Sequence, residues 1–318
     1  MGAWMNFIHS SCCKLSRPVP VTAIVSLIGL SMCRLFGFRA EVNTTVHKSL
    51  VEAENSLCEQ SSRHPDGWGV AYYVGNTPHI IRSLDTAQAD SLFKNVSASI
   101  TAHTFLAHLR KATQGSSHMQ NTHPFQFGPW VFAHNGNIKR FEVLRTRLEE
   151  FIDPSLRRYV FGKTDSEVIF FILLTELKRR GLLFDGAARC PLELVSGIAT
   201  CVNILIDVAG PIHERSDGDP GENYYSFIIT NGPVMAGFNG GKDLHYSTHK
   251  TCCSVKEGCP LFSEFCEKPA SVNGTVRHLL ISSEVIEGEN VWEFLPRGEV
   301  VGVGGDMVFR REVVLGVA

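Results

Sequence analysis

The sequence predicts an α+β protein in which stacked antiparallel sheets lie between layers of helices. The expected strands and helices of this 318-residue chain come in pairs rather than in strict alternation, which argues against a doubly wound parallel sheet. Residues 70–74 and 79–84 flank the turn sequence Gly-Asn-Thr-Pro, a pattern typical of a β-hairpin. Residues 104–110 and 130–135 are nearly continuous apolar runs, typical of strands buried on both faces.

The other elements follow from hydrophobic periodicity and from end signals. Residues 164–180 predict the strongest helix, because Thr164 and Glu167 fit a capping box and a basic cluster followed by Gly181 closes the segment. Further helices are expected at residues 44–58, 86–100 and 141–151. Further strands are expected at residues 33–40, 199–208, 224–230, 276–282 and 299–309.

Composition indicates an ordinary globular enzyme, with 44% hydrophobic residues, 19% charged residues and a net charge of −2. The chain has no basic block, which argues against nucleic acid as a partner. The 12-residue apolar run at residues 19–30 is too short to span a bilayer, which needs roughly 20 residues, so no membrane is expected. The ten cysteines are irregularly spaced and suit a reducing, cytoplasmic location better than a disulfide framework.

Residues 1–32 are expected to be a leader, either a misassigned start or a segment that is removed. They resemble a weak signal peptide, and a targeting segment is the alternative interpretation. The working domain is expected at residues 33–318. Met32 directly precedes Cys33, and a Met-Cys start allows the methionine to be trimmed, which leaves a cysteine with a free α-amine. A thiol and an amine on one residue combine a nucleophile with its own base.

Four further residues could complete a site around Cys33. Asn135 and Gly136 follow a buried strand and offer a side-chain amide and a backbone N–H at one place, as an oxyanion hole requires. Arg110 lies at the end of its expected strand, and its rigid guanidinium group could bind a substrate carboxylate through two N–H groups. Asp165, in the first turn of the strongest helix, could accept a hydrogen bond from a substrate ammonium group.

Five short motifs occur in one order along the chain and support one another. They are Met32-Cys33-Arg34, residues 108–113 (HLRKAT), 121–125 (NTHPF), 133–138 (AHNGNI) and 163–167 (KTDSE). This ordered set resembles the class II glutamine amidotransferases, which belong to the N-terminal-nucleophile hydrolases. The family's fold is a four-layer αββα sandwich. The segments at residues 66–69 and 282–284 resemble its stand-alone branch, which includes the γ-glutamyl hydrolases of fungal glutathione degradation and of ergothioneine synthesis.

The resemblance implies that the enzyme hydrolyses the γ-glutamyl amide bond of glutamine or of a γ-glutamyl conjugate. Cys33 would form a thioester, and Asn135 and Gly136 would stabilise the oxyanion. The substrate-binding residues would be Arg110 for the α-carboxylate, Asp165 for the α-ammonium, and Thr113 and His123 for the rest of the glutamate pocket. No cofactor and no metal are implied. A separate ammonia-accepting or peptidase subunit is a possible partner, since no second domain large enough to use ammonia is expected.

Each residue also has a plainer interpretation. Without the motif order, Thr164 to Glu167 is only a helix cap, Asn135-Gly136 a turn, and Cys33 a packing thiol. Three histidines, at positions 108, 123 and 134, could suggest a metal, but satisfied core histidines are the simpler interpretation for His108 and His134. A non-catalytic regulatory module of the same fold is the alternative function. The cysteines between residues 252 and 266 could ligate zinc, although their spacing matches no CxxC pair.

Overall fold

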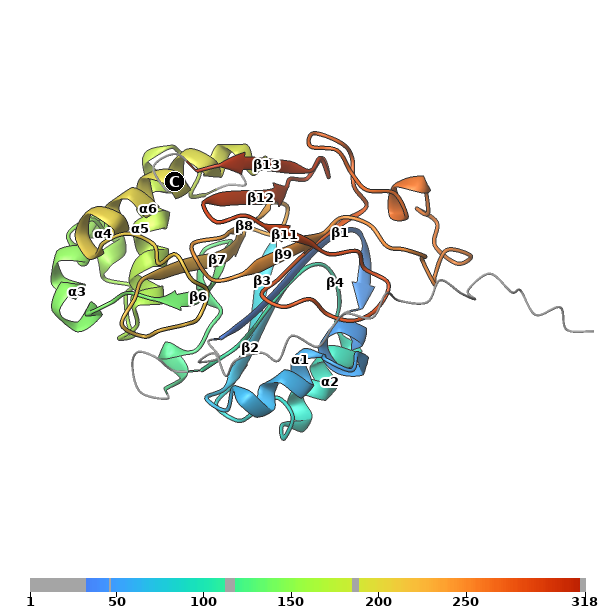
Figure 1. Ribbon diagram of the computed structural model, residues 1–318, viewed down its shortest axis with the longest axis horizontal. Helices are drawn as coiled ribbons and strands as arrows, with labels where there is room; N and C mark the ends of the chain where they lie inside the picture. Colours follow the sequence, from blue (N-terminus) through green and yellow to red (C-terminus); the bar gives the residue numbers. More distant parts are fainter. Residues whose placement is uncertain (1–32, 46, 112–117, 185–188, 315–318) are drawn as a thin grey trace, which may run out of the picture.

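Two antiparallel sheets face one another and determine the architecture (Figure 1). The computed structural model describes residues 33–45, 47–111, 118–184 and 189–314. Sheet A has seven strands in the order β11-β9-β10-β1-β4-β2-β3, and sheet B has six in the order β13-β12-β8-β7-β6-β5. Every paired strand in both sheets is antiparallel, as the hairpin pattern and the paired elements predict.

The elements have the following bounds. Sheet A contains β1 (Arg34–Thr45), β2 (Trp68–Val74), β3 (Thr77–Ser83), β4 (Thr101–Leu109), β9 (Leu244–Ser247), β10 (His278–Ser282) and β11 (Glu293–Leu295). Sheet B contains β5 (Phe125–Phe127), β6 (Trp130–Asn137), β7 (Tyr224–Thr230), β8 (Met235–Phe238), β12 (Glu299–Val303) and β13 (Arg310–Val313). The helices are α1 (Leu57–Gln60), α2 (Ser91–Ser99), α3 (Phe141–Glu149), α4 (Pro154–Arg157), α5 (Asp165–Arg179) and α6 (Leu192–Ala209). Short turns of other helix types are η1 (Lys48–Glu52), η2 (Ser61–Arg63), η3 (Met119–Asn121) and η4 (Glu264–Cys266).

Helices cover the outer faces of both sheets, so the molecule has four layers (Figure 1). Helices α1 and α2 pack on sheet A, where Phe93 is buried with Phe36 and Phe105. Helices α5 and α6 pack on sheet B, where side chains such as Phe170 stack on Phe132. A third apolar cluster lies between the sheets and joins them. The αββα sandwich expected for an N-terminal-nucleophile hydrolase is therefore confirmed.

Strand β1 lies inside sheet A, between β4 and β10. Its register places Arg34 opposite Leu109 of β4 and Phe36 opposite Ser282 of β10. The residue before β1 therefore lies beside the C-terminal end of β4. The site described below is built at this end of the two sheets.

The predicted helix at residues 44–58 is wrong at its start. Strand β1 continues through Thr44 and Thr45, which pair with Ala102 and Thr101 of β4 after a bulge. The β-branched residues of this stretch suit a strand, and their register with β4 outweighs the amphipathic pattern. Helical structure begins only at η1, and α1 starts after the N-cap Ser56.

The predicted strand at residues 199–208 is also wrong, because this segment is the second half of the 18-residue helix α6. The helical period was present in its buried residues, among them Leu194, Ile198, Cys201, Val202 and Leu205. A short apolar run cannot be assigned from its composition alone, since buried strands and buried helices look alike. By length and composition α6 could also cross a membrane, but here it packs on α5 and sheet B.

Candidate active site

Cys33 stands immediately before β1 and is almost fully buried, with 8% of its surface exposed. Its thiol lies against the backbone of Lys111, just beyond β4. The Sγ atom donates to the Lys111 carbonyl oxygen at 3.3 Å and accepts from the Lys111 N–H at 3.3 Å. The contact needs only the backbone of Lys111, so the lysine side chain at this position does not disturb it.

Two opposing effects act on the Cys33 thiol. Burial raises the pKa of the thiol, and this effect prevails over the hydrogen bond from Lys111 and the positive charges of Arg110 and Arg34. The negative charge of Asp165 also raises the pKa. The thiol therefore stays protonated at neutral pH, and an attack by sulfur requires a base that takes up its proton.

Arg110 is buried, and its backbone is held by the turn that precedes β2. The Arg110 N–H donates to the Gly67 carbonyl at 2.8 Å, and the Asp66 N–H donates to the Arg110 carbonyl at 3.3 Å. Gly67 has a φ of +111°, a conformation that favours glycine, and a Cβ there would lie 2.5 Å from the Ser83 carbonyl oxygen. The Asp-Gly-Trp-Gly segment thus fixes the position of Arg110 beside Cys33.

Asn135 and Gly136 lie in β6, at the same end of the molecule. Asn135 is buried, and its Oδ1 has no hydrogen-bond partner among the residues that the structure describes. The Oδ1 atom therefore keeps the capacity to accept a hydrogen bond from a ligand. A Cβ at Gly136 would lie 2.0 Å from the Tyr224 carbonyl oxygen and 2.2 Å from Nε2 of His134, so no larger residue fits without a backbone shift.

Asp165 is the first residue of α5 and is buried. Its Oδ2 accepts from the Ile138 N–H at 2.7 Å, and its Oδ1 accepts from the Ser166 N–H at 2.7 Å. The carboxylate thus ties the start of α5 to the chain that leaves β6. A carboxylate has about four acceptor positions, so this one can accept a further hydrogen bond from a cationic ligand.

The capping box predicted at the start of α5 is only half right. Thr164 is the N-cap, and its side chain accepts from the Glu167 N–H at 3.3 Å. The Glu167 carboxylate reaches farther back and accepts from the N–H groups of Phe161 and Gly162, at 3.0 and 2.6 Å. Glu167 therefore orders the turn before the helix.

His108 and His123 form a buried pair with ring centroids 4.1 Å apart. Burial, with Arg110 next in size, lowers the pKa of His108 to about 3. Burial and the neighbouring His108 lower the pKa of His123 well below its usual range. Both rings are neutral at physiological pH. Within the described ranges, no ring nitrogen of the pair makes a hydrogen bond of ordinary geometry, so the expectation of a satisfied core histidine is wrong for His108.

The same expectation is confirmed for His134. Its Nε2 donates to the Tyr224 carbonyl at 3.1 Å, and its Nδ1 accepts from the Ser166 hydroxyl at 2.9 Å. Burial lowers the pKa of His134, although Asp165 opposes this effect. The neutral ring thus connects β6, β7 and the first turn of α5.

Electrostatic interactions connect four of the predicted site residues. Arg110 and Asp165 both act on Cys33, and Arg110 also acts on His123. Asn135 and Gly136 adjoin His134, on which Asp165 acts. Thr113 lies outside the described residues. The roles assigned to all seven residues remain predictions.

Ser283 and Glu284 hold the start of β1, a role that the sequence did not predict. The Leu35 N–H donates to the Ser283 hydroxyl at 3.0 Å, and the Ser283 N–H donates to the Leu35 carbonyl at 3.0 Å. Arg34 forms an ion pair with Glu284. The Ser-Ser-Glu segment was noticed in the sequence, but only the fold places it against residues 34 and 35.

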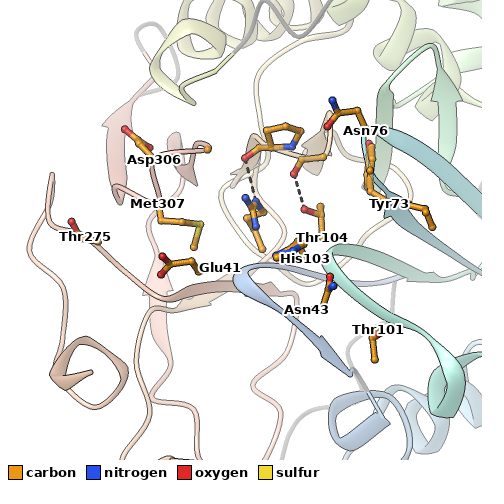
Figure 2. Close-up of a pocket in the computed structure, with 16 residues that line it drawn as sticks. Glu41, Asn43, Tyr73, Asn76, Thr101, His103, Thr104, Thr275, Asp306 and Met307 are labelled. Atoms are coloured by element: carbon orange, nitrogen blue, oxygen red, sulfur yellow. Dashed lines mark hydrogen bonds between the residues drawn. The ribbon is translucent and has the colours of Figure 1, made fainter. Parts of the chain in front are cut away.

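A polar cavity of about 620 Å³ opens farther along β1 and is separate from this site (Figure 2). Figure 2 shows Glu41, Asn43, His103 and Asp306 around it. Arg39 also lines the cavity, but its Nε donates to the Pro233 carbonyl at 3.3 Å and so connects the sheets. None of the predicted site residues lines this cavity.

The cysteine loop does not form a metal site in the described parts of the chain. No group of three or more His, Cys, Asp or Glu side chains there is arranged to hold a metal ion. Cys33, Cys58, Cys190, Cys201, Cys253, Cys259 and Cys266 are free thiols.

Comparisons with known proteins agree with this geometry. A family model described as "Glutamine amidotransferases class-II" matches residues 32–200, more than half of the chain. An uncharacterized protein of Methanocaldococcus jannaschii is 28% identical over 69% of this chain and 55% of its own length. The glutamine–fructose-6-phosphate aminotransferase of Vibrio vulnificus is 31% identical over 67% of this chain and 31% of its own length. The gamma-glutamyl-hercynylcysteine sulfoxide hydrolase of Mycobacterium tuberculosis is 38% identical over 24% of this chain and 33% of its own length.

The chain thus spans less than two thirds of the length of each of these relatives. The solved structure of a glutamine aminotransferase class-II domain protein from Silicibacter pomeroyi superposes with a TM-score of 0.56 at 20% identity. That match covers 88% of this chain and 98% of the other, and it supports the fold. Because the family model covers more than half of the sequence, the chain belongs to the class II glutamine amidotransferases.

Proposed function

We propose that this protein hydrolyses the γ-glutamyl amide bond of glutamine or of a γ-glutamyl conjugate through a thioester on Cys33. One observation carries the proposal. The Cys33 thiol lies between the backbone N–H and carbonyl of Lys111, next to a buried guanidinium and near a buried carboxylate. A substrate with an α-carboxylate and an α-ammonium group matches these two charges.

The chemistry requires a proton acceptor, because burial keeps the Cys33 thiol protonated. A free α-amine on Cys33 would take up the thiol proton as sulfur attacks the γ-carbonyl carbon. The Asn135 amide and the Gly136 N–H would stabilise the negative oxygen that forms. The C–N bond then breaks, and the leaving nitrogen takes the proton from the amine. Water hydrolyses the thioester, which releases glutamate and regenerates the thiol.

In this proposal, two residues of opposite charge bind the two charged groups of the substrate. Arg110 holds the α-carboxylate, and Asp165 accepts from the α-ammonium. His123 supplies a neutral wall, which its low pKa supports. Thr113 would contribute from the loop after β4. These groups hydrolyse the amide without a cofactor.

The free α-amine requires that residues 1–32 be absent from the working enzyme. The family match, which begins at residue 32, supports this requirement. The buried position of Cys33 at the very start of β1 supports it as well. We propose that the active protein is the segment of residues 33–318, located in the cytoplasm, where the free thiols seen in the structure would persist.

Two of the relatives point to the two substrate classes. The name of the Mycobacterium relative describes hydrolysis of a γ-glutamyl conjugate, which supports hydrolysis as the purpose. The name of the Vibrio relative describes glutamine use for amino transfer, which supports the alternative of an ammonia-supplying subunit with a separate acceptor. We favour hydrolysis, with a separate peptidase subunit as the partner that takes the released amine product.

The decisive experiment measures glutamate release from glutamine, glutathione and other γ-glutamyl amides by protein whose intact mass shows Cys33 as its first residue. Cys33→Ala is expected to abolish release and to leave the melting temperature nearly unchanged. Full activity with residues 1–32 attached would contradict the α-amine as base. A folded, correctly processed protein that releases no glutamate from any γ-glutamyl amide would favour the non-catalytic module.

Arg110→Lys tests the carboxylate contact separately. Lysine keeps the charge but loses the two-pronged geometry of the guanidinium, so KM is expected to rise more than kcat falls. An unchanged KM would contradict this role.

A further inference from the structure

The loop between β9 and β10 carries four cysteines, at positions 252, 253, 259 and 266, that the proposed reaction does not use. This segment, residues 248–277, is called the thiol loop below. It projects at the right of Figure 1, in orange, and η4 is its one helical turn. Its backbone is a series of tight turns, in which the Lys256 N–H donates to the Cys253 carbonyl and the Phe262 N–H to the Cys259 carbonyl.

Three of the four cysteines line one cavity. The cavity has a volume of about 330 Å³ and lies between the thiol loop and sheet A. Cys253, Cys259 and Cys266 line it on the loop side, and apolar residues of β1 such as Phe36 and Phe38 line it on the sheet side. Cys253 and Cys266 are buried, while Cys259 is half-buried and is the most accessible of the three.

Hydrogen bonds hold the two arms of the thiol loop side by side. The Lys250 N–H donates to the Cys266 carbonyl at 2.8 Å, and the Cys253 N–H donates to Oε1 of Glu267 at 2.7 Å. The two buried cysteines therefore lie on adjacent arms, and Cys259 lies on the chain that joins these arms. The exchange proposed below requires these turns to bring Cys259 to one of its two neighbours.

Cys58, Cys190 and Cys201 do not line this cavity. Cys201 and Cys58 are buried, and each donates to a carbonyl oxygen at 3.8 or 3.9 Å. Cys190 is half-buried and lines neither this cavity nor the polar cavity beside β1. Among residues 33–45, 47–111, 118–184 and 189–314, the thiol loop combines a half-buried thiol with buried thiols around one cavity.

We propose that this cavity is a thiol–disulfide exchange site for low-molecular-weight disulfides, with Cys259 as the entry thiol. The Cys259 thiolate attacks one sulfur of the small disulfide RSSR, forms a mixed disulfide and releases RS⁻. The thiolate of Cys253 or Cys266 then attacks the Cys259 sulfur and displaces the second RS⁻. Two protein thiols are oxidised to one intramolecular disulfide, and one RSSR is reduced to two thiols.

The intramolecular disulfide that forms links two turns of the thiol loop across the cavity. It closes a short loop, which restricts the unfolded chain and stabilises the folded one. The exchange does not involve Cys33, so it is independent of the proposed hydrolysis.

The test exposes the folded protein to oxidised glutathione at neutral pH, blocks the remaining thiols by alkylation and maps the peptides by mass spectrometry. We expect a disulfide that links Cys259 to Cys253 or Cys266, with loss of two hydrogen masses. Cys190, in contrast, is expected to carry glutathione or to stay free. If Cys190 becomes glutathionylated while all three cavity cysteines are alkylated as free thiols, the proposal is wrong.

Matched variants separate the entry role from general reactivity. Cys259→Ser is expected to remove the intramolecular product, whereas Cys190→Ser is expected to leave its rate unchanged. A disulfide that forms at an undiminished rate in Cys259→Ser would refute the entry role. Stoichiometric zinc in the reduced protein, protecting the three thiols together from alkylation, would instead make the cavity a metal site and overturn the proposal.

Discussion

The substitution Asp165→Asn separates structural support from substrate binding, because α5 contains an internal control two residues away. Asp165 accepts from the N–H groups of Ile138 and Ser166, both at 2.7 Å. Glu167 likewise accepts from two backbone N–H groups through its two oxygens. Both carboxylates are buried in the first turn of the same helix, but only Asp165 acts electrostatically on Cys33.

The stability effect should be similar for Asp165→Asn and Glu167→Gln. An amide has one oxygen where a carboxylate has two, so each substitution leaves one buried N–H facing an NH₂ group. A buried unsatisfied donor costs about 1–3 kcal/mol. Loss of a negative charge at a helix N-terminus adds about 0.3–1 kcal/mol. The free energy of unfolding, measured in urea, should therefore fall by about 1–4 kcal/mol in both variants.

The activity effect should differ between the two variants. If Asp165 binds the substrate ammonium, the lost charge-assisted hydrogen bond costs a further 1.5–3 kcal/mol or so, roughly a tenfold to hundredfold fall in kcat/KM. Glu167→Gln should keep kcat/KM within a few-fold of the parent at a temperature where both variants are folded. Equal losses in the two variants would refute the binding role and would leave Asp165 as a structural clamp.

Two further predictions follow from the same end of the molecule. Gly136→Ala should lower the free energy of unfolding by about 3 kcal/mol, because its Cβ would lie 2.0 Å from the Tyr224 carbonyl oxygen. In the control Gly258→Ala the new Cβ meets no atom within 4 Å, so the free energy of unfolding should change by less than about 0.5 kcal/mol. Equal urea midpoints for the two variants would contradict the close contact at Gly136. Stability should also decrease as pH falls below about 6.5, since the unfolded chain protonates His108 there whereas the folded protein, with its pKa of about 3, does not. For His108 the free energy of unfolding falls by about 1 kcal/mol between pH 6.5 and pH 5.5, and His123 acts in the same direction. A urea midpoint that does not change over this range would show that the rings become protonated in the folded state.

The sequence predicted most reliably those elements whose signals are local. The β2–β3 hairpin and the N-cap of α5 depend on turn residues and a capping threonine, and both are confirmed. The helix at residues 192–209 has a helical period in its buried residues, but the segment at residues 199–208 has no turn or capping signal, so its composition does not distinguish it from a buried strand. Thr44 and Thr45 joined β1 because β4 offers them partners more than 50 residues away.

The motif order named the candidate site residues, but it did not predict the backbone contacts that hold them in place. The backbone contact between Cys33 and Lys111 joins residues 78 positions apart. The contact between Ser283 and Leu35 joins residues 248 positions apart. Such contacts depend on strand register, which no pattern within a single segment encodes.

The position of β1 inside sheet A has a consequence for how the family region is defined. The stretch recognised by the family model ends at residue 200, so it includes β4 but not β10. A fragment cut at that boundary would leave one edge of β1 unpaired and would lack Ser283 and Glu284, which contact the residues next to Cys33. The recognisable amidotransferase segment is therefore not an autonomous folding unit, and the last third of the polypeptide is part of the framework on which the chemistry depends.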